Sequence, residues 1–190
     1  MPSSRHAEPL YELILEAEVM VAARDGVGLA TDVYRPARAG KPVEGRFPVI
    51  LERTPYGKHL ASRSELDAGE QNPRSRLEIA RYFVEQGYIV VYQDCRGRYG
   101  SQGRFIKYLS DGEDGFDTVE WIARQPWCDG RVATMGLSYA AHTQMAAGCL
   151  APKALAAMVL DCGGFSNAYR VAIRNGGAEV ADTLVIRVLL

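Results

Sequence analysis

Residues 11–34 carry the hydrophobic and polar pattern of two short strands joined by a turn. Apolar residues predominate over 19–23 and again over 27–33, and Asp25-Gly26 lies between the two runs. Asp-Gly is a favoured two-residue turn between antiparallel strands. Prolines and glycines then interrupt the pattern over 35–47, which is typical of a loop. We therefore expect an antiparallel hairpin followed by a loop.

Apolar runs without polar alternation recur after this loop, and helical spacing of apolar residues separates them. Such runs are typical of strands covered on both faces, as in a parallel sheet. Strands that alternate with helices predict an α/β fold with a largely parallel sheet behind the antiparallel hairpin. Strands are predicted over residues 47–51, 88–93, 131–136 and 155–160, and helices over residues 77–84, 110–123 and 139–150.

Single residues indicate where some of these elements begin and end. Gly87 stands where a helix C-terminus favours glycine. Ser110 and Glu113 have the spacing of a capping box, which predicts that the second helix begins there. Residues 58–75 are polar and predict a surface loop, whereas residues 178–190 are compatible with either a helix or a strand.

Ser138 lies between a predicted buried strand and an alanine-rich helix, with Gly136 two residues before it and Ala140 two residues after it. This G-x-S-x-small pattern is typical of the nucleophile elbow, a sharp strand-to-helix turn that exposes a serine hydroxyl. A serine nucleophile must be exposed, oriented and paired with a base. The alternative interpretation is that Ser138 only caps the helix, as serine commonly does.

Tyr56 follows the strand predicted at 47–51, within a loop bounded by Pro55 and Gly57. In α/β-hydrolases the corresponding loop supplies a second hydrogen-bond donor to the oxyanion. The Tyr56 phenol can serve as this donor beside the backbone N–H of Tyr139. The alternative is a turn tyrosine that packs on its proline neighbour.

Asp94 to Gly103 forms a glycine-punctuated stretch with two interpretations. A glycine-rich loop can hold phosphate, but this one has neither a G-x-G-x-x-G pattern nor the lysine of a Walker loop. We favour a structural turn in which Asp94 and Arg96 pair with each other.

Four stretches together resemble the cocaine esterase / X-prolyl dipeptidyl aminopeptidase family of acyl hydrolases, which includes α-amino-acid ester hydrolases. The resemblance covers about residues 19–180 and implies an α/β-hydrolase fold. It also implies Ser138 as the nucleophile, with the Tyr56 hydroxyl and the Tyr139 amide as the oxyanion hole. The matching stretches are Asp25-Gly26 with Leu29–Pro36, Arg53–Lys58, Asp94–Gly103 (D-x-R-G-x-x-G-S-x-G), and Asp111–Gly115 continued by Trp121, Pro126-Trp127, Gly130 and Gly136–Tyr139.

The base and the acid of a catalytic triad are not recognisable in the sequence. In this fold the acid and then the histidine follow the serine. His6, His59 and His142 are predicted to be structural or surface residues. Asp161 ends the last predicted strand, but the resemblance implies that the catalytic aspartate lies beyond an inserted cap.

We therefore expect an incomplete α/β-hydrolase. Residues 1–18 would be a tail and the start of the first strand, residues 19–163 the N-terminal half of the hydrolase domain, and residues 164–190 the beginning of the cap. The resemblance implies that the later strands, the rest of the cap and a C-terminal jelly-roll domain lie past Leu190. The expected function is ester, amide or peptide hydrolysis through an acyl-enzyme, with negligible turnover by this chain alone. The alternative is a non-catalytic product that acts as a binding or vestigial protein.

Charge and composition limit the kinds of partner that the chain is expected to bind. The formal net charge is −1, and no run of lysine or arginine predicts a nucleic-acid or membrane-surface partner. No apolar stretch approaches the roughly 20 residues that span a bilayer, and the N-terminus lacks an apolar signal core, so a cytoplasmic location is predicted. The four cysteines lack metal-site spacing and are expected to be reduced. We expect a small ester, amide or short peptide substrate, with no cofactor and no metal, and the sequence is compatible with a homo-oligomer.

Overall fold

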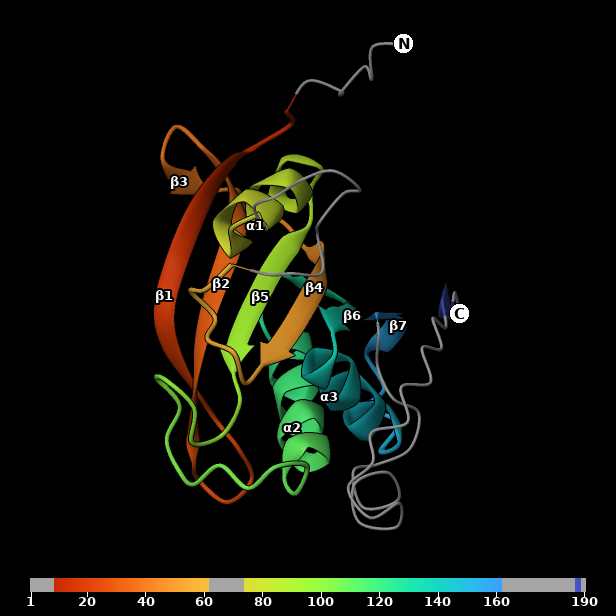
Figure 1. Cartoon of the computed structure of the whole chain (residues 1–190). Helices are drawn as coiled ribbons and strands as arrows, with labels where there is room; N and C mark the ends of the chain where they lie inside the picture. Colours follow the sequence, from red (N-terminus) through yellow and green to blue (C-terminus); the bar gives the residue numbers. More distant parts are fainter. Residues whose placement is uncertain (1–8, 62–73, 162–186, 189–190) are drawn as a thin grey trace, which may run out of the picture.

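The computed structural model describes residues 9–61, 74–161 and 187–188. In this part of the chain an eight-stranded sheet runs in the order β1-β2-β5-β4-β6-β7-β8, with β3 paired to β2 (Figure 1). The strands are β1 (Glu12–Ala22), β2 (Gly28–Arg38), β3 (Lys41–Pro42), β4 (Phe47–Thr54), β5 (Ile89–Asp94), β6 (Cys128–Leu137), β7 (Leu155–Asp161) and β8 (Arg187–Val188), and the helices are α1 (Arg76–Glu85), α2 (Asp111–Ala123) and α3 (Tyr139–Gly148).

The predicted hairpin is present, but its turn differs from the prediction. β1 and β2 are antiparallel and pair from Ala22 opposite Gly28. The Gly26 N–H donates to the carbonyl of Ala23 at 2.8 Å, and the Ala23 N–H donates to the carbonyl of Val27 at 2.9 Å. Gly26 has φ +83°, so the turn has three residues and ends on a left-handed glycine. The loop predicted over 35–47 is partly wrong, because β2 continues to Arg38 and returns as β3.

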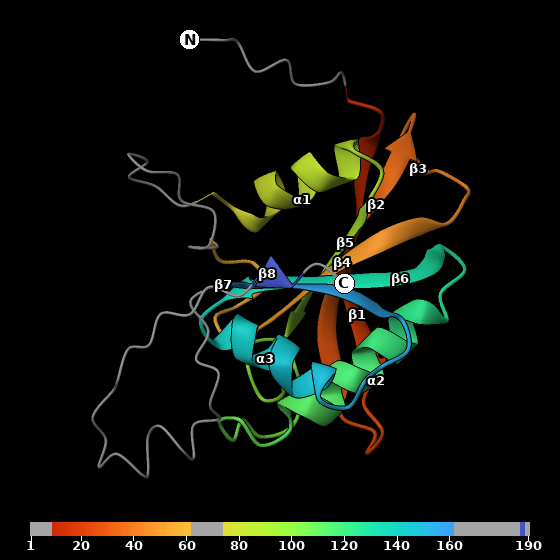
Figure 2. The same cartoon turned by 90° about the vertical axis from the view of Figure 1, so that its right-hand side faces the viewer.

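The centre of the sheet is parallel, as the unalternated apolar runs predicted. β5, β4, β6 and β7 are parallel neighbours, while β2 joins β5 antiparallel. Side chains alternate between the two faces of each strand: Val49 and Leu51 of β4 belong to one buried cluster and Ile50 belongs to the other. Both faces therefore need a cover, and Figure 2 shows α1 on one face with α2 and α3 on the opposite face.

The helix starts are only partly as predicted. Ser75 and Glu78 form the capping box of α1, and Gly87, with φ +86°, follows its end, as predicted for that glycine. The capping box predicted at Ser110 is wrong, because this serine makes no side-chain cap hydrogen bond. The first turn of α2 instead carries three acidic residues, which the positive end of the helix dipole favours.

Several predictions fall on residues outside the described ranges. Most of the segment 164–190 is among them, although residues 187–188 form β8, which pairs antiparallel with β7. The loop predicted over 58–75 is described at its two ends only. None of the helices in the described ranges is long and apolar enough to cross a membrane.

Candidate active site

Ser138 forms the sharp turn between β6 and α3. Its backbone is left-handed, with φ 58° and ψ −113°, a strained conformation for a residue other than glycine. The side chain is exposed and makes no cap hydrogen bond to the helix. Ser138 occupies the N-cap position of α3, but its hydroxyl does not cap the helix, so side-chain capping does not explain this serine. Its N–H donates to the carbonyl of Asp161 at 2.9 Å, which ties the turn to the end of β7.

The small residues on either side of Ser138 are explained by close contact. Gly136 has φ +144°, and a Cβ placed on it would lie 2.5 Å from the Cβ of Ala140. A side chain at position 136 would therefore clash with the first turn of α3. This contact is the physical reason for the G-x-S-x-A pattern.

Sheet order brings Tyr56 to Ser138. β4 and β6 are adjacent parallel strands, so the loop after β4 and the turn after β6 lie at the same edge of the sheet. The Tyr56 hydroxyl lies 3.3 Å from Ser138 Oγ, and the tyrosine is 47% exposed. The residue before Tyr56 is also held: the carbonyl of Pro55 accepts a hydrogen bond from Arg98 Nε at 2.9 Å.

Tyr139 offers its backbone N–H and its side chain to different neighbours. The N–H is at the first position of α3, where a helix supplies no acceptor of its own. The ring is buried and stacks on Tyr108 at 5.0 Å between ring centroids. The hydroxyl donates to Asp111 Oδ2 at 2.7 Å and accepts the N–H of Tyr108 at 2.8 Å. Burial, and then the hydrogen bond to Asp111, raise the pKa of Tyr139.

The two described histidines occupy different surroundings. His142 contacts the edge of Tyr108, with 4.4 Å between centroids, and its Nε2 lies 3.7 Å from Asp111 Oδ2. Burial lowers the pKa of His142. His59 is 60% exposed and pairs with Glu18 at 3.1 Å. These contacts match the structural and surface roles expected of the two residues, whereas His6 lies outside the described residues.

The Asp94–Gly103 loop is a structural turn, but its charges pair differently from the prediction. Asp94 accepts the N–H of Lys58 at 2.8 Å. Arg96 binds Asp114 and Asp25, at 2.6 Å each. The predicted pair between Asp94 and Arg96 is therefore wrong. Arg96 instead joins the loop to the hairpin turn and to α2.

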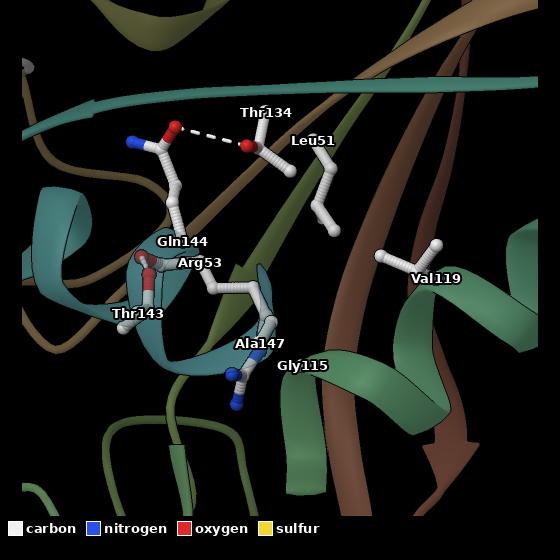
Figure 3. Close-up of a pocket in the computed structure, with 8 residues that line it drawn as sticks. All are labelled: Leu51, Arg53, Gly115, Val119, Thr134, Thr143, Gln144 and Ala147. Carbon is white, nitrogen blue, oxygen red and sulfur yellow. Dashed lines mark hydrogen bonds between the residues drawn. The ribbon is translucent and has the colours of Figure 1, made fainter. Parts of the chain in front are cut away.

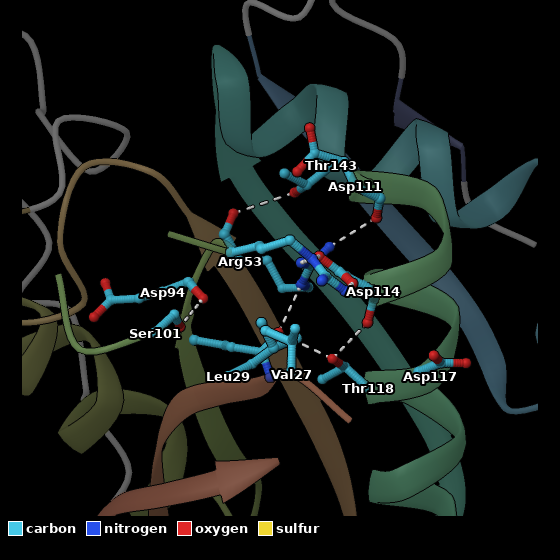
Figure 4. Close-up of polar contacts among 12 residues, drawn as sticks. Val27, Leu29, Arg53, Asp94, Ser101, Asp111, Asp114, Asp117, Thr118 and Thr143 are labelled. Carbon is cyan, nitrogen blue, oxygen red and sulfur yellow. Dashed lines mark hydrogen bonds and ion pairs between the residues drawn. The ribbon is translucent and has the colours of Figure 1, made fainter. Parts of the chain in front are cut away.

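A buried polar network surrounds Arg53, among the strand and the helices that position the site (Figure 4). The sequence pattern did not predict this network. Arg53 Nε donates to Gln93 Oε1 at 2.7 Å, and Nη1 donates to the carbonyl of Asp111 at 2.8 Å. Thr118 donates to the same Gln93 oxygen at 2.9 Å, and Thr143 donates to the Arg53 carbonyl at 3.2 Å. The network therefore joins the end of β4 to both α2 and α3. Asp114, in the acidic run beginning at Asp111, lies 3.7 Å from Arg53 Nη2, and this run was the available sequence signal.

A small cavity lies beside this network, between the sheet and the helices α2 and α3 (Figure 3). Its volume is about 10 Å³, roughly the space that one water molecule needs. The cavity is too small for an organic substrate. It is lined by Leu51, Arg53, Gly115, Val119, Thr134, Thr143, Gln144 and Ala147.

A charged cluster lies at the base of the Tyr56 loop. Ligand atoms of Glu18, Asp32 and His59 lie within 4.8 Å of one another, which is close enough for a metal ion. Lys58 Nζ lies 3.1 Å from Asp32 Oδ1 and 2.7 Å from His59 Nε2, so an ammonium group already supplies positive charge there.

The described cysteines are free thiols. Cys95 and Cys128 are buried and Cys149 is exposed, and none of these three forms a disulfide. Burial raises the pKa of Cys95 to about 12, so this thiol stays protonated. Cys162 lies outside the described residues.

The sequence and the fold resemble those of known hydrolases. A sequence profile of the X-Pro dipeptidyl-peptidase (S15 family) matches residues 25–188. The cocaine esterase of Rhodococcus sp. (strain MB1 Bresler) is 42% identical over 128 residues, which cover 67% of this chain and 20% of that protein. A CocE/NonD family hydrolase from Staphylococcus aureus aligns with a TM-score of 0.67 at 29% identity, over 83% of this chain and 29% of that chain. An α-amino acid ester hydrolase aligns with a TM-score of 0.64 at 29% identity, over 86% of this chain and 27% of that chain.

The chain spans 20% of the cocaine esterase and less than a third of the two solved structures. The family resemblance predicted from four motifs is confirmed by the profile match and by the structural likeness. The parallel sheet and its covering helices are those of an α/β-hydrolase, as expected. On this match, which extends over most of its length, the chain belongs to the X-Pro dipeptidyl-peptidase (S15) family.

Proposed function

We propose that this chain carries the nucleophile and the oxyanion hole of a serine acyl hydrolase. In this proposal Ser138 Oγ gives its proton to the base of the triad and attacks an ester or amide carbonyl. The bond to the leaving group then breaks, the leaving group takes up that proton, and the acyl-enzyme forms. The negative oxygen of the tetrahedral intermediate accepts hydrogen bonds from the Tyr56 hydroxyl and from the Tyr139 N–H. Water then releases the acid and regenerates the serine.

The observation that carries the proposal is the pairing of an exposed, left-handed Ser138 with the hydroxyl of Tyr56 at 3.3 Å. A turn that only caps a helix needs neither this backbone strain nor a partner from another strand. A phenol at that distance can donate a hydrogen bond to the oxyanion that forms beside the serine. The loss of one such donor typically slows a reaction about 100- to 1000-fold.

The relatives are much longer than this chain. We therefore expect the base and the acid of the triad in a part of the enzyme outside these 190 residues. The partners of the two described imidazoles are Lys58, Glu18, Asp32 and Asp111, and neither ring is hydrogen-bonded to Ser138 Oγ. Loss of a triad member typically costs on the order of 10⁶-fold in rate, while the oxyanion hole and binding still leave about 10³–10⁴-fold over water. We therefore expect negligible turnover by the 190-residue chain, together with slow acylation of Ser138.

The test is to incubate the purified chain with p-nitrophenyl acetate and to follow both nitrophenol release and intact mass. One acetyl group should appear on Ser138 without steady turnover, and Ser138→Ala should abolish this label. Ser110→Ala is the matched control, because Ser110 stands at the N-cap of α2 as Ser138 does at α3. Undiminished labelling of Ser138→Ala would contradict the proposed nucleophile, and robust turnover by the chain would contradict the missing base.

The substrate belongs to the same proposal. The relatives' names include a cocaine esterase and an α-amino acid ester hydrolase, which supports a small ester. The family is named for an X-Pro dipeptidyl-peptidase, which supports an amide or short peptide. A homo-oligomer, a cytoplasmic location and the absence of nucleic-acid and membrane partners stay predictions, which light scattering and cell fractionation would test.

A further inference from the structure

Lys58 is the only lysine in the described ranges whose side chain is buried, and its exposure is 0%. An ammonium group leaves water favourably only where charges and hydrogen bonds compensate. Lys58 Nζ lies 3.1 Å from Asp32 Oδ1, contacts Glu18 Oε1 and lies 2.7 Å from His59 Nε2. Burial alone would lower the pKa of Lys58, but the hydrogen bonds that its ammonium donates to Glu18 and Asp32 outweigh burial and the pKa is raised. Lys58 is therefore a charged group held between two carboxylates.

A β-bulge brings Glu18 to this lysine. The register of β1 on β2 shifts between Glu16 and Val19, and Glu18 has a left-handed backbone with φ 56°. Its N–H donates to Asp32 Oδ1 at 2.9 Å. Bulges commonly re-aim a side chain near an active site. Here the bulge directs the Glu18 carboxylate to Lys58, whose hydrogen bond lowers the pKa of Glu18.

The position of Tyr56 depends on the backbone that Lys58 fixes. The Tyr56 ring is half exposed, so packing of the ring itself does little to orient it. Lys58, two residues later, donates its N–H to Asp94 at the end of β5 and places its side chain among residues of β1 and β2. The loop is thereby joined to three strands immediately after the tyrosine that approaches Ser138.

We propose that Lys58 is a positioning residue for the Tyr56 hydroxyl, and that the Glu18–Lys58–Asp32 cluster holds this hydroxyl beside Ser138. The inference rests on the proposed function and deepens it. Lys58 acts through Tyr56 and touches neither Ser138 nor the reacting carbonyl. The ammonium lies among the same carboxylates that a metal ion would need, which favours the positioning role over a metal site.

The experiment measures the rate at which an aryl fluorophosphonate labels Ser138 in the 190-residue chain, by intact mass. Four proteins form a cycle: the unchanged chain, Lys58→Met, Tyr56→Phe and the double variant. Lys58→Met should slow labelling about tenfold, which is part of the effect of losing the Tyr56 donor outright. In the Tyr56→Phe background the same substitution should slow labelling less than about twofold. Lys153→Met, at an exposed lysine, is the matched control and should leave the rate unchanged.

Equal slowing by Lys58→Met in both backgrounds would overturn the proposal, because a purely structural role would not depend on Tyr56. Labelling that survives Ser138→Ala would instead overturn the proposed function. Circular dichroism identifies a Lys58→Met chain that does not fold, since this variant leaves buried Asp32 without its cation. In that case Glu18→Gln, at a residue 55% exposed, completes the cycle: slowing that disappears in the Tyr56→Phe background supports the proposal, and slowing that persists overturns it.

Discussion

Tyr56 and Tyr139 both adjoin Ser138, the first through its hydroxyl and the second as the next residue in the chain, and the fold uses them in opposite ways. Tyr56 is half exposed and directs its hydroxyl to the serine. Tyr139 is buried and directs its hydroxyl away from the serine, to Asp111. The group that it offers to the site is its backbone N–H at the start of α3. One residue therefore offers the site a side chain and the other offers a main-chain group. The same residue type serves a candidate reaction at one position and helix packing at the other.

The supports of the two tyrosines differ in the same way. Tyr139 is held by aromatic stacking on Tyr108 and by a buried hydrogen bond. The Tyr56 loop is held by charges, through Lys58 and through the bond from Arg98 to a backbone carbonyl. Removing a hydroxyl from each tyrosine should therefore separate an effect on rate from an effect on stability.

The largest expected effect is that of Tyr56→Phe on rate. Loss of this donor should slow Ser138 labelling by about 100-fold or more, with little change in the free energy of unfolding, because the hydroxyl is exposed. Labelling kinetics and urea denaturation measure the two quantities. Tyr82→Phe, at an exposed tyrosine of α1, is the control. An unchanged labelling rate would remove Tyr56 from the proposed oxyanion hole.

Tyr139→Phe should show the opposite result. It leaves Asp111 and the N–H of Tyr108 without their partner, which should lower the free energy of unfolding by about 1–3 kcal/mol. The backbone N–H remains, so labelling of the folded variant should change only a few-fold. Urea denaturation beside Tyr82→Phe checks the first expectation. A rate loss as large as that of Tyr56→Phe would show that the two tyrosines do not differ as described.

The smallest effect concerns His142, which packs against Tyr108 and Tyr139. Its pKa is lowered in the folded chain, so the unfolded chain binds the proton more readily and stability falls as the pH drops below about 6.5. The loss stops once the pH is below the lowered pKa. His142→Leu should flatten this slope between pH 7.5 and 5, as urea midpoints would record. An equal slope in both proteins would contradict it.

Much of the sheet could be predicted from local pattern, whereas contacts between distant residues could not. The unalternated runs around Val49 and Val90 predicted buried parallel strands because both of their faces are covered. The capping-box spacing occurs at both Ser110 and Ser75, but the box forms only at Ser75. A three-residue spacing permits a cap, but an N-cap serine typically needs an extended backbone, which Ser75 has (ψ 152°) and Ser110 lacks (ψ 1°).

The sequence by itself determined the elbow at Ser138, because the turn consists of consecutive residues and only small side chains fit at Gly136 and Ala140. Only the tertiary structure decided what the serine meets. Tyr56 is 82 positions away in the chain, and Lys58 is 40 positions from Glu18. Both contacts exist because strand order places separate loops at one edge of the sheet and because a bulge directs the Glu18 carboxylate to Lys58. The residues next to Tyr56, Lys58 and Glu18 in the sequence do not indicate the strand order or the bulge. Both depend on pairing between strands that are distant in the chain.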